Sequence, residues 1–230
     1  MIIRPYGSGD PVTLIVPGLG ATAGEARIPA SGLPGTRIVL TLLGHADAPD
    51  PDPGYWDYRT LATEVGQVEA PQAIGVSLGA AALSALVAAE PDRFTRLVLM
   101  FPAALSRPRT SSALVTAMAE AVEAGDRAAL RALVGGEGRY YEERTDALMR
   151  LGPALRAVAT QVPVPDPAPL RSVGAEVLVV GAESDPLHPV EVAHEVAEAF
   201  PRSRLVVFPS AVPVITHRAE LRELLVDFLT

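Results

Sequence analysis

Short apolar runs alternate with segments of helical periodicity along most of the chain. Six of these runs have the length of buried strands, and helical segments follow several of them. In the last segment, the apolar residues from Leu221 to Phe228 recur at i, i+3, i+4 and i+7, which places them on one helical face. Such alternation is typical of an α/β protein, with a mostly parallel central sheet and helices on both faces. The pattern predicts strands at 12–16, 38–42, 73–76, 97–101, 177–180 and 205–208, and helices near 58–68, 78–89, 189–200 and 221–228.

Residues 103–170 interrupt this alternation, because they have the pattern of short helices alone. Prolines alternate with other residues at 162–169, which predicts a stiff, extended connector back to the sheet. An all-helical insertion at the carboxyl edge of an open sheet is expected to form a small cap that lines the crevice there and excludes water. The simpler alternative is a helical segment that only thickens the core. The expected helices are 112–124, 126–134 and 140–151.

Composition narrows the functions that are open to the chain. Its 230 residues are 49% hydrophobic, so it can bury one substantial core, and we expect a single domain over residues 1–230. The net charge of −8 leaves no basic stripe for a phosphate backbone, so nucleic acid is not expected as a partner. The chain lacks cysteine and its four histidines have no paired spacing, so neither a metal nor another cofactor is expected.

The first residues and the length of the apolar runs indicate where in the cell the protein is expected. The first residues lack the layout of a signal peptide, and the longest apolar run, 78–89, is shorter than the ~17–25 residues that a membrane helix needs. We therefore expect a cytoplasmic protein without a membrane partner. The oligomeric state stays open.

The sequence Gly-Val-Ser-Leu-Gly at 75–79 is the most informative local motif. It lies where the apolar run 73–76 gives way to the helical segment 78–89, so Ser77 falls at the apex of a strand-turn-helix unit. A turn tight enough to raise Ser77 above the sheet crowds its flanks, and Gly75 and Gly79 leave the necessary room. This arrangement is typical of a nucleophile elbow.

With this elbow, the chain resembles the α/β-hydrolase family over nearly its whole length. The segment Pro17-Gly18-Leu19-Gly20 is similar to the family's His-Gly-x oxyanion turn, with Pro in place of His. Gly44-His45-Ala46 stands in the place of the family's Gly-His-Gly loop, and Asp185 with Pro189 matches the Asp-x-x-x-Pro pattern of its acid strand. The resemblance implies one compact domain that begins at the third of the usual eight strands and carries a helical cap at about 103–170.

The resemblance also implies roles for individual residues. Ser77 would be the nucleophile and Asp185 the acid, with a helix-capping role as the alternative for Asp185 and Glu183 as its local competitor. The amides of Leu19 and Leu78 would face a developing oxyanion. Four further residues are candidates for lining the substrate pocket: Gly18, His45, Trp56 and His188.

The histidine is where the chain departs from the family. Most relatives have a Gly-His pair after the last strand, whereas residues 209–213 here contain no histidine and Ala211 stands near the usual position. In one interpretation His217, at the start of the last helix, is the base. In a second, His45 or His188 at the carboxyl edge of the sheet is the base. In a third, no base exists and Ser77 is a relic.

The function that the resemblance implies is a cofactor-free serine hydrolase acting by acyl transfer on a small ester, thioester or related carbonyl substrate. A serine at the elbow argues against the haloalkane dehalogenase and epoxide hydrolase branches, which use Asp as the nucleophile. The alternative is a non-catalytic ligand-binding protein on the same scaffold, because the usual Gly-His loop is absent.

Overall fold

The computed structural model describes residues 1–52 and 54–230. A seven-stranded sheet forms its centre, with the strand order β1-β3-β2-β4-β5-β6-β7. All neighbouring strands are parallel except β1, which pairs antiparallel with β3. The strands are β1 Ile2–Tyr6, β2 Val12–Val16, β3 Thr36–Thr41, β4 Gln72–Val76, β5 Arg96–Met100, β6 Glu176–Ala182 and β7 Ser203–Phe208.

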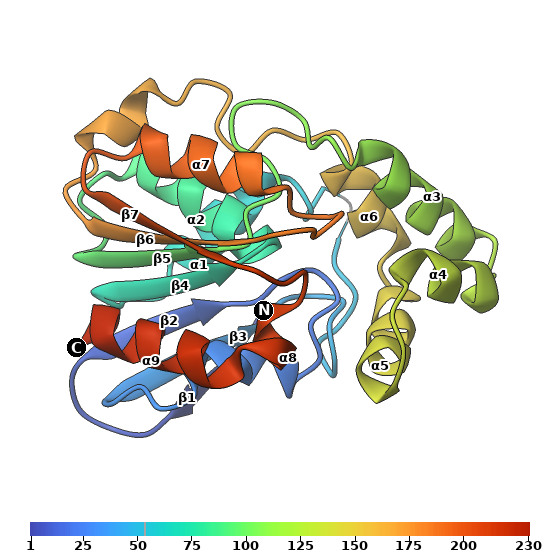
Figure 1. The fold of residues 1–230 in the computed structure, drawn as a ribbon, viewed down its shortest axis with the longest axis horizontal. Helices are drawn as coiled ribbons and strands as arrows, with labels where there is room; N and C mark the ends of the chain where they lie inside the picture. The colour runs from blue at the N-terminus through green and yellow to red at the C-terminus, as the bar shows by residue number, and fades with distance from the viewer. Residues whose placement is uncertain (53) are drawn as a thin grey trace.

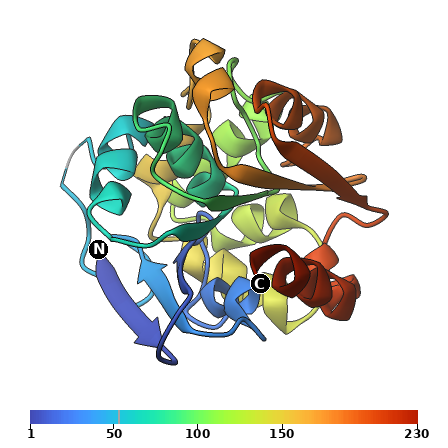
Figure 2. The same cartoon turned by 90° about the vertical axis from the view of Figure 1, so that its left-hand side faces the viewer.

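Helices cover both faces of this sheet, as the alternating pattern predicts. Helices α1, α2 and α7 lie on one face, while the 3₁₀ helix η1 and helix α9 lie on the other (Figures 1 and 2). The helices outside the 103–170 stretch are η1 Glu25–Ala30, α1 Tyr58–Gly66, α2 Leu78–Ala89, α7 Val190–Ala199, α8 Pro213–Thr216 and α9 Arg218–Leu229.

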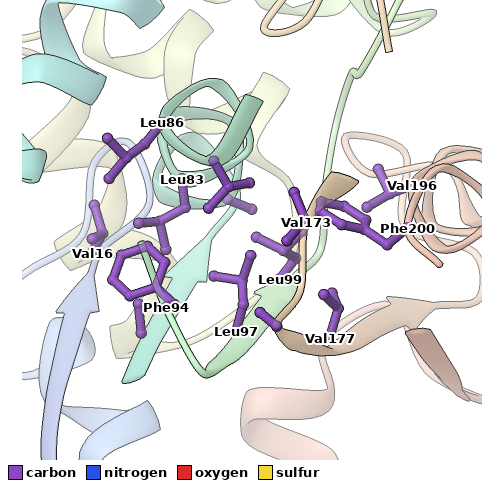
Figure 3. Packing of buried hydrophobic residues seen from close by; sticks show 14 of the residues in the cluster. Val16, Leu83, Leu86, Phe94, Leu97, Leu99, Val173, Val177, Val196 and Phe200 are labelled. Atoms are coloured by element: carbon purple, nitrogen blue, oxygen red, sulfur yellow. The ribbon is translucent and has the colours of Figure 1, made fainter. Parts of the chain in front are cut away.

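The core is built from strand residues that are apolar on both sides of the sheet. Leu83 and Leu86 of α2 pack beside Phe94, and Val196 and Phe200 lie near Val177 of β6 (Figure 3). The longest apolar helix, α2, has 12 residues, and none of the helices in residues 1–52 and 54–230 has the length and apolar content to cross a membrane.

One strand was not predicted. Residues 2–6 form the edge strand β1, whose partners run from Ile2 with Thr41 to Tyr6 with Arg37. The pattern missed it because its side chains alternate between half-buried and exposed, with Arg4 and Pro5 breaking the apolar run. The expectation that the chain starts at the third of the usual strands is therefore wrong, since the sheet begins one strand earlier.

The stretch between β5 and β6 is mostly helical, and its helices within 112–158 lie at the carboxyl end of the parallel strands (Figure 1), whereas residues 168–172 lie against α2 and α7. The helices within 112–158 pack their apolar faces against Leu19, Leu42 and Leu78 of the sheet-bearing part. Arg150 ties them to the body through its ion pair with Asp50 at 2.7 Å. The elements are α3 Ser112–Glu123, α4 Arg127–Val134, α5 Arg139–Leu148, α6 Gly152–Val158 and the 3₁₀ helix η2 Ala168–Ser172. We call α3–α6 the helical insertion; α6 was not predicted, because it opens with Gly152-Pro153.

Candidate active site

Ser77 occupies a strained turn between β4 and α2. Its backbone angles are φ 51° and ψ −104°, in a region that non-glycine residues rarely adopt. The turn is held by the Ser77 amide, which donates to the Met100 carbonyl of β5 at 2.8 Å. The flanking glycines are required by space, since a Cβ on Gly79 would lie 2.1 Å from the Val16 carbonyl oxygen. Strand β4 and helix α2 therefore present the serine hydroxyl at the carboxyl edge of the sheet.

His188 joins this serine to Asp185 by two hydrogen bonds. Its Nε2 lies 2.8 Å from the Ser77 Oγ, and its Nδ1 lies 2.7 Å from the Asp185 Oδ2. An ionised carboxylate can only accept, so Nδ1 carries a proton and donates it to Asp185. In this neutral tautomer Nε2 accepts the Ser77 hydroxyl proton, which is the arrangement of a general base on a nucleophile.

Asp185 holds both the imidazole and the turn that carries it. Its Oδ1 accepts the amides of Leu187 at 2.8 Å and His188 at 3.2 Å, as in an Asx turn. Burial raises the pKa of Asp185, but the bonds from the His188 ring and from these two amides outweigh burial, so its pKa lies below the usual value. The carboxylate is therefore ionised across the neutral range. Asp185 does not cap a helix, since α7 begins at Val190 after Pro189 and has no side-chain cap.

His217 does not approach Ser77, and the prediction that it does so is wrong. Its Nδ1 lies 2.8 Å from the Thr216 Oγ1, and its ring packs 5.6 Å from that of Phe208. The reason lies in the segment before it, because residues 213–216 coil into α8 and keep His217 at the start of α9. Residues 211–214, which precede His217, are the part of this segment that lines a cavity at Ser77.

The turn after β2 lies directly beside the elbow. A Cβ placed on Gly18 would be 3.4 Å from the Ser77 Cβ, so the two turns are in contact. Neither the Leu19 nor the Leu78 amide donates a hydrogen bond to another described residue. Both residues are buried, with 8% and 2% of their surface exposed. Their amides are thus free to donate to a ligand atom next to Ser77.

His45 lies behind this turn and does not line the cavities at Ser77. Its Nε2 accepts the Gly20 amide at 2.9 Å, and its Nδ1 donates to the Leu43 carbonyl at 3.1 Å. Burial, opposed by the bond to Leu43, lowers the pKa of His45 to about 4. The ring is therefore neutral, and its hydrogen bond from the Gly20 amide holds the Gly18-Leu19-Gly20 turn in place. The expectations that it is a pocket residue or the base are both wrong.

Trp56 also lies away from the serine. Its side chain is buried against Tyr55, with ring centroids 4.9 Å apart, and against the His45 ring at 5.8 Å. Its exposed edge borders a surface groove that includes Arg150, not the cavities at Ser77.

Two cavities open on either side of Ser77 and His188. The smaller one has a volume of about 50 Å³ and is walled mainly by aliphatic side chains of the helical insertion. The larger one has a volume of about 350 Å³ and is bounded by η1, by α5 and by residues 211–214, with Gly18 on its wall. Val134, Arg144, Leu187, Ser77 and His188 line both.

A model of the alpha/beta hydrolase family matches residues 13–222. The chain belongs to this family. No curated protein matches the α/β hydrolase described here by sequence.

Solved structures agree with the fold of this α/β hydrolase. An esterase from Exiguobacterium antarcticum has a TM-score of 0.81 at 20% identity, with 99% of this chain and 94% of that chain covered. A hydrolase from Pseudomonas aeruginosa PA01 has a TM-score of 0.77 at 23% identity, with 99% and 93% covered. A hydrolase from Oleispira antarctica has a TM-score of 0.79 at 18% identity, with 99% and 93% covered. At these identities the likeness is one of fold alone.

Three residues at the site were not identified from the sequence. Phe101 has a positive φ of 51°, and its ring lies 6.4 Å from that of His188. Arg109 is buried, with 8% of its surface exposed, and Arg144 borders both cavities. An arginine in a polar or helical segment ordinarily faces solvent, so no pattern distinguishes these two. A proline directly after Phe101 was the only signal that the chain turns sharply there.

Proposed function

We propose that this α/β hydrolase is a cofactor-free serine hydrolase that acts by acyl transfer on a small ester, thioester or related carbonyl substrate. The observation that carries the proposal is the continuous chain of hydrogen bonds from Ser77 through His188 to Asp185. It lies at the junction of two cavities. Asp185 remains the proposed acid, while His188 replaces His217 as the proposed base.

In the first half of the reaction, the Ser77 Oγ attacks the substrate carbonyl carbon. The His188 Nε2 takes the hydroxyl proton, and Asp185 stabilises the imidazolium through Nδ1. The charge that develops on the carbonyl oxygen is met by the amides of Leu19 and Leu78. When the tetrahedral intermediate collapses, His188 gives its proton to the departing alcohol or thiol, and an acyl-Ser77 ester remains.

In the second half, water attacks the acyl group. His188 now accepts a proton from that water, and the same two amides hold the second tetrahedral intermediate. Collapse releases the carboxylic acid and returns the proton to the Ser77 Oγ. Apart from the substrate and one water molecule, every group that these steps use belongs to the chain.

The helical insertion is proposed to act as the cap of this site. Side chains of α3, α5 and α6 wall the smaller cavity, and they keep bulk water from the serine. The rival proposal of a non-catalytic binding protein rested on the absence of a base. The 2.8 Å contact between His188 and Ser77 supports the presence of a base.

Labelling with a fluorophosphonate probe tests the nucleophile. A serine with a base reacts, so peptide mass spectrometry is expected to locate the adduct on Ser77, and Ser77→Ala is expected to take up no label. Hydrolysis of p-nitrophenyl butanoate provides the parallel readout of turnover. An unlabelled wild-type protein that also leaves this ester intact would contradict the proposal.

A pair of histidine variants tests the base. His188→Gln is expected to lower kcat by about 10³-fold or more, because it removes the group that takes the Ser77 proton. The matched variant His217→Gln alters a histidine outside the site and is expected to keep kcat within about twofold. The reverse pattern would return the role of base to His217.

A further inference from the structure

The smaller cavity beside Ser77 contains a buried arginine without a carboxylate partner. Arg109 lies in the connection between β5 and α3, with 8% of its surface exposed. Its Nε is fully buried and has no hydrogen-bond partner among the described residues. A buried guanidinium without a carboxylate partner and with an unsatisfied Nε is unfavourable for folding, and an anionic ligand in the cavity would compensate it.

The groups around Arg109 do not neutralise it. Tyr58 is buried next to it; burial raises the pKa of Tyr58, and the nearby Arg109 charge only partly opposes this rise, so the phenol stays neutral. The other arginine on the cavity wall, Arg144, is different, because its Nη1 lies 3.4 Å from the Glu25 Oε1. The Tyr58 hydroxyl accepts a hydrogen bond from Arg109 but brings no charge, so Arg109 has no carboxylate partner among the described residues.

Apart from Ser77, His188 and the two arginines, the wall of the smaller cavity is apolar, and it holds no acid among the described residues. Although the chain has 27 acidic and 19 basic residues, no carboxylate among the described residues lines this cavity. The aliphatic wall consists of Leu19, Leu78, Val115, Met118, Val134, Leu148, Leu155, Val158 and Leu187. A methylene chain that ends in an anion complements these surroundings.

The position of Arg109 relative to the reacting groups is fixed. Ser111, two residues on, donates its hydroxyl to the Leu187 carbonyl at 3.3 Å, which ties this connection to the turn that carries His188. Arg109, Ser77 and His188 therefore border one cavity of about 50 Å³, which has room for about four water-sized groups. Two methylenes and a carboxylate fill such a space.

We infer that the smaller cavity receives the acyl part of an ester or thioester of a short dicarboxylic acid, with Arg109 binding the distal carboxylate. This inference rests on the proposed function and names its substrate class. The carbonyl to be attacked lies at Ser77, a short aliphatic chain contacts the leucine and valine wall, and the far carboxylate accepts from the guanidinium. The leaving alcohol or thiol occupies the larger cavity.

The test compares three ethyl esters that differ at the far end of the acyl chain. They are monoethyl succinate, its neutral amide analogue ethyl succinamate, and ethyl butanoate, with hydrolysis followed by chromatography of the acid product. Wild-type protein is expected to show a kcat/KM about tenfold or more higher for monoethyl succinate than for ethyl succinamate, since a charged hydrogen bond is gained. Equal values for the two would overturn the inference.

Variants assign the preference to Arg109. Arg109→Met is expected to lower the ratio of charged to neutral substrate about tenfold or more, and Arg109→Lys is expected to restore part of it. Methionine is a suitable replacement, because an apolar side chain of similar length in place of an unpaired buried charge is compatible with folding. The matched control is Arg107→Met, which removes an exposed positive charge outside the cavity and is expected to leave all three rates unchanged.

Binding of succinate, measured by calorimetry, separates failure of this inference from failure of the proposed function. Succinate bound by wild type and not by Arg109→Met, without hydrolysis of any ester, would retain the carboxylate site and contradict the hydrolase. Hydrolysis of ethyl butanoate with no charge preference and no succinate binding would retain the hydrolase and overturn the carboxylate site.

Discussion

At the scale of single residues, the proposed catalytic pair, Asp185 and His188, is held by few hydrogen bonds. Asp185 uses one carboxylate oxygen for the His188 ring and the other for the amides of Leu187 and His188. The proposed acid and base therefore belong to one turn of four residues, and the contact of His188 with Ser77 and the hydrogen bond from Ser111 to the Leu187 carbonyl join this turn to distant elements. Replacement of Asp185 is therefore expected to change kcat without a comparable change in stability.

Asp185→Asn is predicted to lower kcat by about 10²–10⁴-fold, the range of effect when the group that fixes the histidine tautomer is lost. The Asn carbonyl can still accept the Leu187 and His188 amides, so the turn is retained. Its amide would donate toward the His188 Nδ1, however, which forces the proton onto Nε2 and blocks the base. The melting temperature is expected to change by less than about 4 °C, the shift for about 1 kcal/mol in a chain of this size. Unaltered kcat would direct the same measurement to Glu183.

His45 gives a pH-dependent prediction. The pKa of His45 is about 4 in the folded protein, whereas an unfolded histidine has a pKa of ~6.5. Above pH ~6.5 neither state is protonated and the stability is complete; as the pH falls toward 4 only the unfolded state binds the proton, so stability is lost. About 2 kcal/mol should be lost between pH ~7 and ~4.5 from this residue alone.

Urea unfolding at both pH values measures this loss. His45→Gln is predicted to reduce the pH dependence by about 2 kcal/mol relative to wild type. The matched control His194→Gln replaces an exposed histidine of α7 and should leave the pH dependence as it is. Identical pH dependence in all three proteins would mean that the His45 ring is not held neutral.

At the scale of elements, the elbow and the positions of six of the seven strands in the described residues follow from the sequence, and the histidine that contacts Ser77 does not. Ser77 could be placed because two glycines and the change from strand to helix mark the turn in adjacent residues. His188 was named only as one alternative, because its approach to Ser77 requires the turn of β6 to meet the end of β4 across β5. No local pattern encodes a contact of that kind, and α8 likewise depends on packing that spacing does not reveal.

The elbow gives a prediction of its own. Gly79→Ala is predicted to destabilise the protein by about 2 kcal/mol or more, because the added Cβ would lie 2.1 Å from the Val16 carbonyl oxygen and backbone must move. The shift also separates the Leu78 amide from Ser77, so kcat is expected to fall. Both quantities are measured by thermal unfolding and ester hydrolysis.

The control for this variant is Gly24→Ala. Gly24 has a φ of −71°, and its Cβ would come no closer than 3.9 Å to any neighbour. Its stability is expected to stay within about 0.5 kcal/mol of wild type or to rise slightly. If Gly79→Ala behaved like Gly24→Ala, the close approach of α2 to the end of β2 would be contradicted.

At the scale of the whole molecule, the proposed reacting groups come from the sheet, and the walls of the space around them come mainly from the helical insertion. Ser77, His188 and the free amides all come from turns at the carboxyl edge of the sheet. The walls of the smaller cavity come largely from α3, α5 and α6. Chemistry and selectivity are therefore expected to respond to substitutions in different parts of the chain.

Met118 and Leu114 of α3 test this division. Met118 is buried on the wall of the smaller cavity, whereas Leu114 lies on the same helix and is half-buried outside it. Met118→Ala should extend the cavity and raise the ratio of kcat/KM for p-nitrophenyl hexanoate over the butanoate by about tenfold, since two more buried methylenes contribute ~1.6 kcal/mol. Leu114→Ala should lower the melting temperature through lost packing but keep this ratio. If both variants kept the ratio of wild type, α3 would not border the acyl chain, and the cap would have to be assigned to another segment.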